Sequence, residues 1–495
     1  MSLNLEQRQA VEYTGGHSLI IAGPGTGKTH TLIARIIHLA EHLTSQEKIL
    51  AITFTNKAAQ EMAQRLRAGS IRMDAVSVGT FHQTCLNILR RFVEQTPLPK
   101  DFKIAIPEDI DSILKELWPN KTSRERADII EQIGFIKSTE LVLEATPELS
   151  AYQKALRAKG FIDVDDILRD ALMLLSNNDE VLTLLRQEYR YICVDEYQDT
   201  NRVQHALLKL LAQDGVVLTA IGDPNQAIYG FRGAEAEIFY RFEDDFNGAK
   251  LFYLKENYRS GVNILSASSQ VMGSGSRQGV PAITAKLFID GKLAIYEATT
   301  DRSEAEYIAH QIEKMVGGFD MRTSRQATRS FGEIAILYRL NAQANVLKQA
   351  FDHLGIPYQV AQKRTISDNA DANALGQSEE TLDYDIEKVS LLTLHAAKGL
   401  EFGVVFIVGC EDQLIPLDLA NIKGDIEEER RLFYVGMTRA KEELYLTFAK
   451  RRQLFGQAHL LNSSPFLADI KEDLKRYEIN RRKKVVLNDD QLKLF

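Results

Sequence analysis

The sequence from residue 18 to residue 29 reads Ser18-Leu19-Ile20-Ile21-Ala22-Gly23-Pro24-Gly25-Thr26-Gly27-Lys28-Thr29. Its first five residues form an apolar, strand-like run, the next five form a glycine-rich turn, and residues 30–41 continue with a helix-forming composition. A strand, a glycine loop and a helix in this order predict a P-loop, in which backbone N–H groups and the helix N-terminus surround phosphate groups. The stretch therefore predicts a nucleotide-phosphate site in an α/β sheet.

The residues of this loop have separate expected roles. Lys28 would place its ammonium group on the β- and γ-phosphate oxygens, and Thr29 would bind Mg²⁺ through its hydroxyl. The expected phosphate contacts are Ala22, Gly23, Pro24, Gly25, Thr26, Gly27, Lys28 and Thr29. The strict pattern has glycine at the position of Ala22, so the first position departs from it, and a glycine-rich turn without a nucleotide is the alternative.

Two acidic residues follow another apolar run, Ile192-Cys193-Val194-Asp195-Glu196. Beside a P-loop in the same sheet, Asp195 would hold Mg²⁺ through water, and Glu196 would orient and deprotonate the attacking water. A solvated strand end is the alternative for such a pair alone.

Two series of strand-like runs, separated by helical segments, extend this pattern. The first series comprises residues 18–22, 49–54, 76–79, 191–194 and 216–222, and the second comprises 293–297, 333–338, 389–394, 404–408 and 444–448. Strands that alternate with helices predict parallel sheets, so we expect an α/β protein with two lobes. Between residues 90 and 186 the pattern turns helical and charged, which indicates an insertion in the first lobe.

Composition narrows the class of protein. The chain has 495 residues, of which 44% are hydrophobic and 26% charged, and no apolar run approaches the ~20 residues that cross a bilayer. The N-terminus lacks a secretion signal, and Cys85, Cys193 and Cys410 lie too far apart for a disulfide framework or a zinc site, so we expect a cytoplasmic protein. A net charge of −8 argues against a histone-like coat on nucleic acid but not against a local binding groove.

Further motifs occur in a fixed order along the chain. They are Leu3-Asn4 with Gln7, then 53–59, 79–82, Asp195-Glu196-Tyr197-Gln198-Asp199-Thr200-Asn201, 222–234, Asn257-Tyr258-Arg259-Ser260, 394–402 and 428–440. In content and order they resemble the UvrD/Rep group of superfamily 1A DNA helicases over most of the chain. The resemblance implies two RecA-like P-loop lobes with ATP in the cleft between them and single-stranded DNA across their top.

The resemblance also implies roles for residues around ATP. Gln7 would read adenine, Tyr258 would pack on the nucleoside, Glu401 would contact the ribose, and Gln226 would sense the γ-phosphate. Arg259 and Arg439 resemble the arginine fingers of the family, which neutralise charge on the transferred phosphoryl group and link hydrolysis to closure of the lobes. For an isolated arginine, a surface ion pair is the alternative.

Another set of residues is expected to contact DNA. By resemblance these are Phe54, Thr55, Asn56, Thr80, His82, Tyr229, Phe231, Arg232 and His395. Aromatic faces stack on any base, which suits a motor that ignores sequence, although each ring has core packing as its alternative. Phe231 stands where the family usually has Trp, so its stacking surface is smaller. Arg339 resembles a phosphate contact and has a structural role as its alternative.

The motifs also set the expected domain boundaries. Residues 1–89 and 187–258 would form the first lobe, 90–186 a helical, 1B-like insertion, and 259–474 the second lobe. In full-length members of the family, a helical accessory subdomain, 2B, separates the segments that resemble 338–359 and 389–402. Here only the mostly polar residues 360–388 lie between them, so we expect a short linker and a helicase activity that is weak for the chain alone or depends on a partner.

Residues 475–495 are expected to form a flexible tail. It ends in Gln491-Leu492-Lys493-Leu494-Phe495, which resembles the QLxLF peptide by which bacterial proteins dock on the replicative sliding clamp. Gln491, Leu492, Leu494 and Phe495 would then bind that partner. Packing of Leu494 and Phe495 on the second lobe is the alternative.

These observations predict an ATP-dependent translocase or helicase for single-stranded DNA or a 3′-tailed duplex, in replication or repair. The resemblance implies 3′-to-5′ polarity and a monomeric, nucleoid-associated protein. The main alternative is an ATP-gated DNA-binding or displacement module that scarcely moves, but an intact set of Glu196, Arg259 and Arg439 favours a motor. A nuclease fusion would need an acidic metal-binding cluster after Arg439, and small-molecule phosphotransfer would need an acceptor pocket; the sequence indicates neither.

Overall fold

The computed structural model describes residues 2–69, 71–141, 146–273, 282–287, 289–317, 329–363, 380–381, 387–419 and 422–478. The predicted linker, residues 360–388, lies mostly outside this described part, and the candidate clamp-binding peptide, Gln491–Phe495, lies wholly outside it. None of the described helices is both long enough and apolar enough to cross a membrane.

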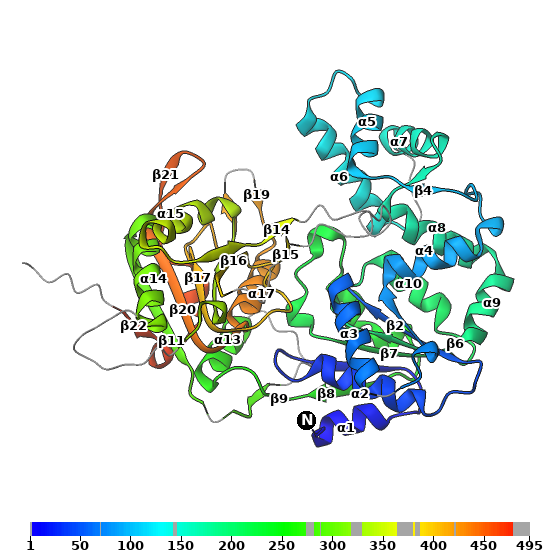
Figure 1. Cartoon of the computed structure of the whole chain (residues 1–495), viewed down its shortest axis with the longest axis horizontal. Coiled ribbons are helices and arrows are strands. Elements are labelled where there is room, and N and C mark those ends of the chain that lie inside the picture. Colours follow the sequence, from blue (N-terminus) through cyan, green and yellow to red (C-terminus); the bar gives the residue numbers. More distant parts are fainter. Residues whose placement is uncertain are drawn as a thin grey trace, which may run out of the picture.

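A six-stranded parallel sheet forms the first lobe, on the right in Figure 1. Its strands, in spatial order, are β3 (Val76–Thr80), β2 (Lys48–Thr53), β6 (Tyr189–Val194), β7 (Val217–Gly222), β1 (Ser18–Ala22) and β8 (Lys250–Leu254). The five strand-like runs of the first predicted series are confirmed. Strand β8 was not predicted, because this edge strand is only partly buried and its apolar run is short.

Both faces of this sheet are buried, which explains its continuous apolar strands. In β2, Ile49 and Ala51 belong to one core and Leu50 and Ile52 to the other. Removing one such Ile side chain from water stabilises the fold by about 1.5–3 kcal/mol. The helices that cover the two faces are α1 (Leu5–Glu12), α2 (Lys28–Ala40), α3 (Asn56–Ala68), α4 (Phe81–Arg91), α8 (Val164–Asn177), α9 (Asp179–Glu188) and α10 (Arg202–Leu211).

The helical insertion has a small core of its own. Helices α5 (Pro107–Leu117), α6 (Ser123–Thr139) and α7 (Pro147–Ala158) stand above the first sheet in Figure 1, and Tyr152 and Leu156 are fully buried among them. Strands β4 (Lys103–Ile104) and β5 (Phe161–Ile162) pair at its base. Helices α8 and α9 pack on the core of the first sheet instead, so this separate core spans less of the chain than the predicted insertion, 90–186.

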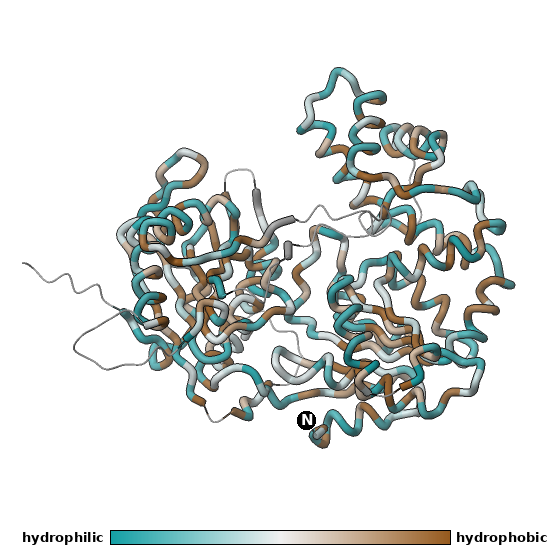
Figure 2. The backbone as a smooth tube through the Cα atoms, viewed as in Figure 1, coloured by the Kyte–Doolittle hydropathy of each residue, from teal (hydrophilic) through white to brown (hydrophobic). Residues whose placement is uncertain are grey.

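The second lobe contains another parallel sheet, on the left in Figure 1. Its strands, in spatial order, are β13 (Tyr358–Val360), β16 (Val389–Thr393), β12 (Ile334–Tyr338), β17 (Phe402–Val408), β20 (Ala440–Leu454), β11 (Lys292–Thr300) and β22 (Arg476–Tyr477), with β21 (Gln457–Leu460) antiparallel to β20. The five predicted runs of the second series are confirmed, and apolar residues concentrate in the strands of both sheets in Figure 2. Residues 476–477 fall in the predicted tail but pair with β11.

Four main helices surround the second sheet: α13 (Val262–Gly273), α14 (Asp301–Val316), α15 (Ala344–Leu354) and α17 (Ile426–Met437). The remaining short elements are α11 (Ala236–Tyr240), α12 (Phe242–Asp245), α18 (Pro465–Ala468), β9 (Glu256–Asn257), β10 (Thr284–Ala285), β14 (Gln362–Lys363), β15 (Glu380–Thr381), β18 (Asp418–Leu419) and β19 (Ile422–Lys423). The α/β class with parallel sheets is therefore confirmed.

Candidate active site

The P-loop lies between the end of β1 and the start of α2. Gly25 and Gly27 have φ angles of 67° and 81°, in the left-handed region that favours glycine. A Cβ atom on Gly25 would also lie 2.6 Å from the side chains of Asn257 and Arg259. No side chain caps α2, so its first backbone N–H groups can serve a phosphate, and the residues present fit a nucleotide.

The acidic pair follows the end of β6 in the same sheet. The N–H of Glu196 donates to Asp195 Oδ1 at 2.9 Å, and the left-handed φ of 49° at Glu196 turns the chain sharply there. Burial and the charge of Glu196 raise the pKa of Asp195 to about 7. Burial also acts to raise the pKa of Glu196, but the charges of Lys28 and Lys398 help to lower it, which keeps this carboxylate ionised as a base requires.

Gln198 and Gln226 connect the acidic pair to Asp223, the residue that follows strand β7. Gln198 donates through Nε2 to Glu196 and accepts from the N–H of Asp223 at 3.0 Å. Gln226 donates to Asp223 Oδ2 at 2.7 Å and is 2% exposed. The candidate γ-phosphate sensor therefore shares a hydrogen-bonded network with the candidate base.

The two candidate arginine fingers approach this network from the second lobe. Arg259 Nε lies 2.7 Å from Glu401 Oε2. Arg439 is 2% exposed and donates through Nε to the carbonyl of Val435. Burial and then the charge of Arg259 lower the pKa of Arg439 to about 9, whereas Glu196 acts to raise it. Arg439 is therefore within electrostatic range of both Arg259 and Glu196.

The candidate adenine and nucleoside contacts are attached to the same loop. Gln7 Nε2 donates to the carbonyl of Thr26 at 3.0 Å, and the N–H of Tyr258 donates to the carbonyl of Gly25 at 2.8 Å. The side chain of Tyr258 is 41% exposed, and its hydroxyl accepts from Asn4 Nδ2 at 2.9 Å. An exposed ring beside the P-loop is a suitable surface for a base.

Aromatic side chains from both lobes form a continuous row. Phe54 stacks on Tyr229 with 5.1 Å between ring centroids, Tyr229 and Phe231 are 6.0 Å apart, and Phe231 meets His395 edge to face at 5.5 Å. The guanidinium of Arg232 lies over the rings of Tyr229 and Phe231. Phe231 is 56% exposed, so the row presents an aromatic surface beside a cation, as single-strand binding requires.

Most of the other predicted DNA residues are buried or hydrogen-bonded within the protein. Thr55 and Thr80 cap helices α3 and α4, and Asn56 is the first residue of α3. His82 is 7% exposed, and burial lowers its pKa to about 4. Arg339 Nη2 pairs with Glu429 Oε1 at 2.7 Å, the geometry expected for its structural alternative.

Lys398 is a residue of this site whose role was not predicted. Its Nζ lies 2.6 Å from Asp199 Oδ2 and 2.6 Å from the carbonyl oxygen of Gln226, and 4.9 Å from the ring centroid of Tyr229. Both Lys398 and Asp199 lie in recognised motifs, but the sequence does not show that the two motifs meet. The contact joins the second lobe to the segment that carries the candidate base.

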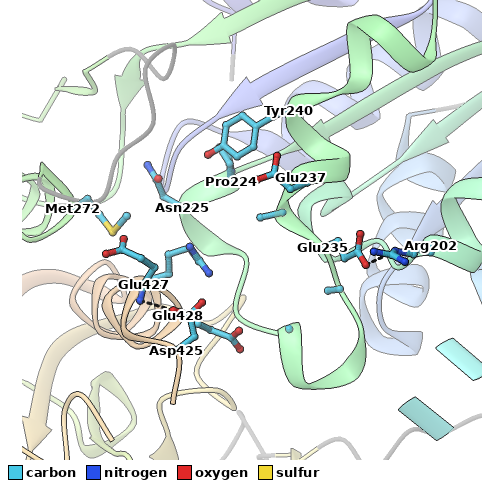
Figure 3. A pocket seen from close by; sticks show the side chains of 14 residues that line it. Arg202, Pro224, Asn225, Glu235, Glu237, Tyr240, Met272, Asp425, Glu427 and Glu428 are labelled. Carbon is cyan, nitrogen blue, oxygen red and sulfur yellow. Dashed lines mark hydrogen bonds and ion pairs between the residues drawn. The ribbon is translucent and has the colours of Figure 1, made fainter. Parts of the chain in front are cut away.

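A separate cavity of about 670 Å³ lies between the first lobe and α17. In Figure 3, Glu235 and Glu237 lie on one side and Asp425, Glu427 and Glu428 on the other. Arg202, paired with Glu235, and Arg431 are the basic side chains of its lining. Five carboxylates against two guanidinium groups make this cavity unfavourable for phosphates, so it fits neither the nucleotide nor the DNA backbone.

Comparisons with known proteins agree with this geometry. Residues 3–247 match the family model of the UvrD/REP helicase N-terminal domain, and residues 252–370 and 364–451 match that of the UvrD-like helicase C-terminal domain. The chain belongs to the UvrD/Rep-like group of superfamily 1A helicases.

Individual relatives are similar over nearly the whole chain. The ATP-dependent DNA helicase PcrA of Staphylococcus epidermidis is 29% identical, and the alignment covers 99% of this chain and 89% of the relative. PcrA of Staphylococcus aureus is also 29% identical, with 95% and 86% covered. The predicted membership of this family is therefore confirmed.

Proposed function

We propose that the chain is an ATP-driven translocase on single-stranded DNA, with 3′-to-5′ polarity and a role in replication or repair. The observation that carries this proposal is the contact of Lys398 with both Asp199 and Tyr229. It connects the aromatic row, a surface for bases, to the segment that carries the candidate base Glu196. A motor needs such a connection, because hydrolysis must respond to the DNA that it moves.

The residues around the P-loop support the ATPase half of the proposal. Lys28 would bind the β- and γ-phosphates, and Thr29 with Asp195 would hold Mg²⁺, which supplies positive charge to the phosphates. Glu196 would orient the attacking water and take its proton, and Gln226, held by its hydrogen bond to Asp223, would sense the γ-phosphate. Arg259 and Arg439 would stabilise the negative charge that develops during transfer.

A short form without most of the 2B subdomain is part of the proposal. The family model of the C-terminal domain matches in two pieces that meet at residues 364–370, inside the expected linker 360–388. The alignment to PcrA of Staphylococcus epidermidis spans 663 positions, although this chain has 495 residues, so that relative has segments without a counterpart here. We therefore expect weak unwinding by the chain alone, which efficient separation of a long 3′-tailed duplex would disprove.

The C-terminal peptide supports a second proposal, docking on a bacterial sliding clamp. Its support is the sequence Gln491-Leu492-Lys493-Leu494-Phe495, with apolar anchors at the last two positions. A pull-down with the clamp should recover the full chain but not a chain that lacks these five residues. Equal recovery of both would refute docking.

The first experiment is steady-state ATP hydrolysis with and without single-stranded DNA, for the intact chain and for Glu196→Gln. Strong stimulation by DNA that the substitution abolishes would support a coupled motor. The alternative, an ATP-gated binding or displacement module, predicts ATP and DNA binding without stimulation. Polarity is then measured by placing a block at the 3′ or at the 5′ end of the single strand. A protein that moves 3′ to 5′ should reach the block at the 5′ end.

A further inference from the structure

Three charged side chains form a continuous set beside the P-loop: Lys441, Glu401 and Arg259. Lys441 Nζ lies 2.7 Å from Glu401 Oε1, and Arg259 Nε lies 2.7 Å from Glu401 Oε2. One carboxylate therefore holds two cations, each through a separate oxygen. Burial acts to raise the pKa of Glu401, but the hydrogen bond from Lys441 and the charge of Arg259 outweigh it and lower that pKa, so the carboxylate is ionised.

The main chain on both sides of this carboxylate is fixed. Ser260 Oγ donates to the carbonyl of Ala440 at 2.7 Å, and the N–H of Gly261 donates to the carbonyl of Lys441 at 2.9 Å. These bonds join the segment that follows Arg259 to the start of β20. Arg259 and Lys441 are therefore held close together by their backbones.

Arg259 is also held against the P-loop. Its N–H donates to Asn257 Oδ1 at 2.9 Å, and Asn257 Nδ2 donates to the carbonyl of Pro24 at 2.6 Å. The Cβ atom of Arg259 lies within contact distance of Gly25. With the backbone fixed beside the phosphate site, the remaining freedom of Arg259 is the direction of its guanidinium group.

Glu401 restricts that direction through one nitrogen. It engages Nε, and within the described residues Nη1 and Nη2 of Arg259 make no hydrogen bond. A guanidinium held at Nε keeps its two terminal nitrogens as a fork that matches phosphate oxygens. The pair therefore orients the arginine and leaves its phosphate-binding edge available.

We propose that Glu401 is a positioning residue for Arg259, and that Lys441 fixes the Glu401 carboxylate in the position that this requires. The inference rests on the proposed ATPase function. It gives Glu401 a second role beside the ribose contact implied by the family, and it gives Lys441 a role in hydrolysis.

Substitutions separate these roles by their effect on kcat, measured with saturating ATP and single-stranded DNA. We expect Glu401→Ala to lower kcat about tenfold, and Glu401→Gln, which keeps an acceptor for Nε, and Lys441→Met to lower it about threefold each. The control is Lys450→Met, which removes a surface ion pair with Glu297 and should leave kcat unchanged. Thermal unfolding of each variant excludes loss of folded protein as the cause.

The ribose contact is tested with 2′,3′-dideoxy-ATP, which lacks both ribose hydroxyls. If Glu401 acts through Arg259, the kcat ratio between wild type and Glu401→Ala persists with this nucleotide. If it acts only through the ribose, the substitution raises KM for ATP, and the two proteins become equal with the dideoxy nucleotide. Equal kcat values of wild type and Glu401→Ala with the dideoxy nucleotide would overturn the inference.

A double substitution supplies the decisive comparison. In an Arg259→Ala background, Glu401→Ala should lower single-turnover hydrolysis no further, because the residue through which it acts is gone. A further tenfold loss would overturn the inference. A wild type that hydrolyses no ATP would overturn the proposed function together with it, whereas an active wild type with an unchanged Glu401→Ala variant would overturn the inference alone.

Discussion

Lys398 and Asp199 form a buried ion pair that joins the two lobes. The two Nζ–Oδ distances are 2.6 and 2.8 Å, and the side chains of Lys398 and Asp199 are 7% and 0% exposed. A buried pair of this kind is costly to break, because the partner that remains is an uncompensated charge. The pair therefore constrains how the second lobe moves against the segment after Glu196.

Loss of this pair should uncouple hydrolysis from DNA. We expect Lys398→Met to lower the stimulation of ATPase activity by single-stranded DNA about tenfold or more. The measurement is the ratio of turnover with and without saturating DNA. The double variant Lys398→Met with Asp199→Asn removes the unpaired carboxylate and should regain thermal stability but not stimulation. Full stimulation in the single variant would contradict the proposed connection.

Phe231 should contribute directly to DNA affinity. Because base stacking on an aromatic side chain is worth about 1–3 kcal/mol, Phe231→Ala should weaken binding of single-stranded DNA by about fivefold or more. Phe231→Trp enlarges the stacking surface and should strengthen binding. Fluorescence anisotropy at fixed salt measures both. Tyr477→Ala, at an exposed ring on edge strand β22, is the control and should bind like the wild type.

His82 should make the protein sensitive to acid. Its pKa is lowered to about 4 in the folded state, whereas the unfolded chain takes up a proton near pH 6.5, so stability is lost as the pH falls from about 6.5 toward 4. At pH 5 the loss from this residue is about 2 kcal/mol. His82→Asn should therefore reduce the fall in Tm between pH 7.5 and pH 5. Replacement of the exposed His310 by Asn should leave the fall in Tm unchanged. If Tm falls equally in His82→Asn and in wild type, this account of the acid sensitivity is excluded.

The buried Lys137 should stabilise the helical insertion. Its Nζ lies 2.6 Å from Asp163 and 2.7 Å from Asp166, and its side chain is fully buried. Lys137→Met leaves Asp163 without its cation and Asp166 with only Arg157, 3.5 Å away, so we expect a loss of about 3–5 kcal/mol in unfolding free energy. Lys115→Met breaks an exposed pair with Asp111 and should cost about 1 kcal/mol or less. Similar denaturation midpoints for the two variants would count against this role of Lys137.

The strands and the P-loop were predictable because each depends on short sequence patterns. The run 18–29 determines a strand, a turn and a helix locally, and the apolar runs of both series follow from sheets that are buried on two faces. Strand β8 and the short edge strands were missed because a few residues at a sheet edge have no distinct apolar pattern.

Contacts between motifs could not be predicted in the same way. Lys398, Asp199 and Tyr229 lie in separate motifs of the sequence, and only the folded chain brings their side chains together. The pairing of Arg339 with Glu429 is similar, because ninety residues separate the partners. Site residues that act through tertiary ion pairs therefore need the structure.

Strand β20 begins one residue after Arg439 and runs without interruption to Leu454, where it turns into β21. Fifteen residues of strand extend roughly 50 Å. It pairs with β17 between Ala440 and Thr447, with β11 between Glu443 and Arg451, and with β21 between Arg451 and Leu454, so neighbouring strands hold it along its length. Strand β20 therefore moves only together with its sheet, and any rotation of the second lobe about the phosphate site would displace the hairpin of β20 and β21 farther than it displaces Arg439.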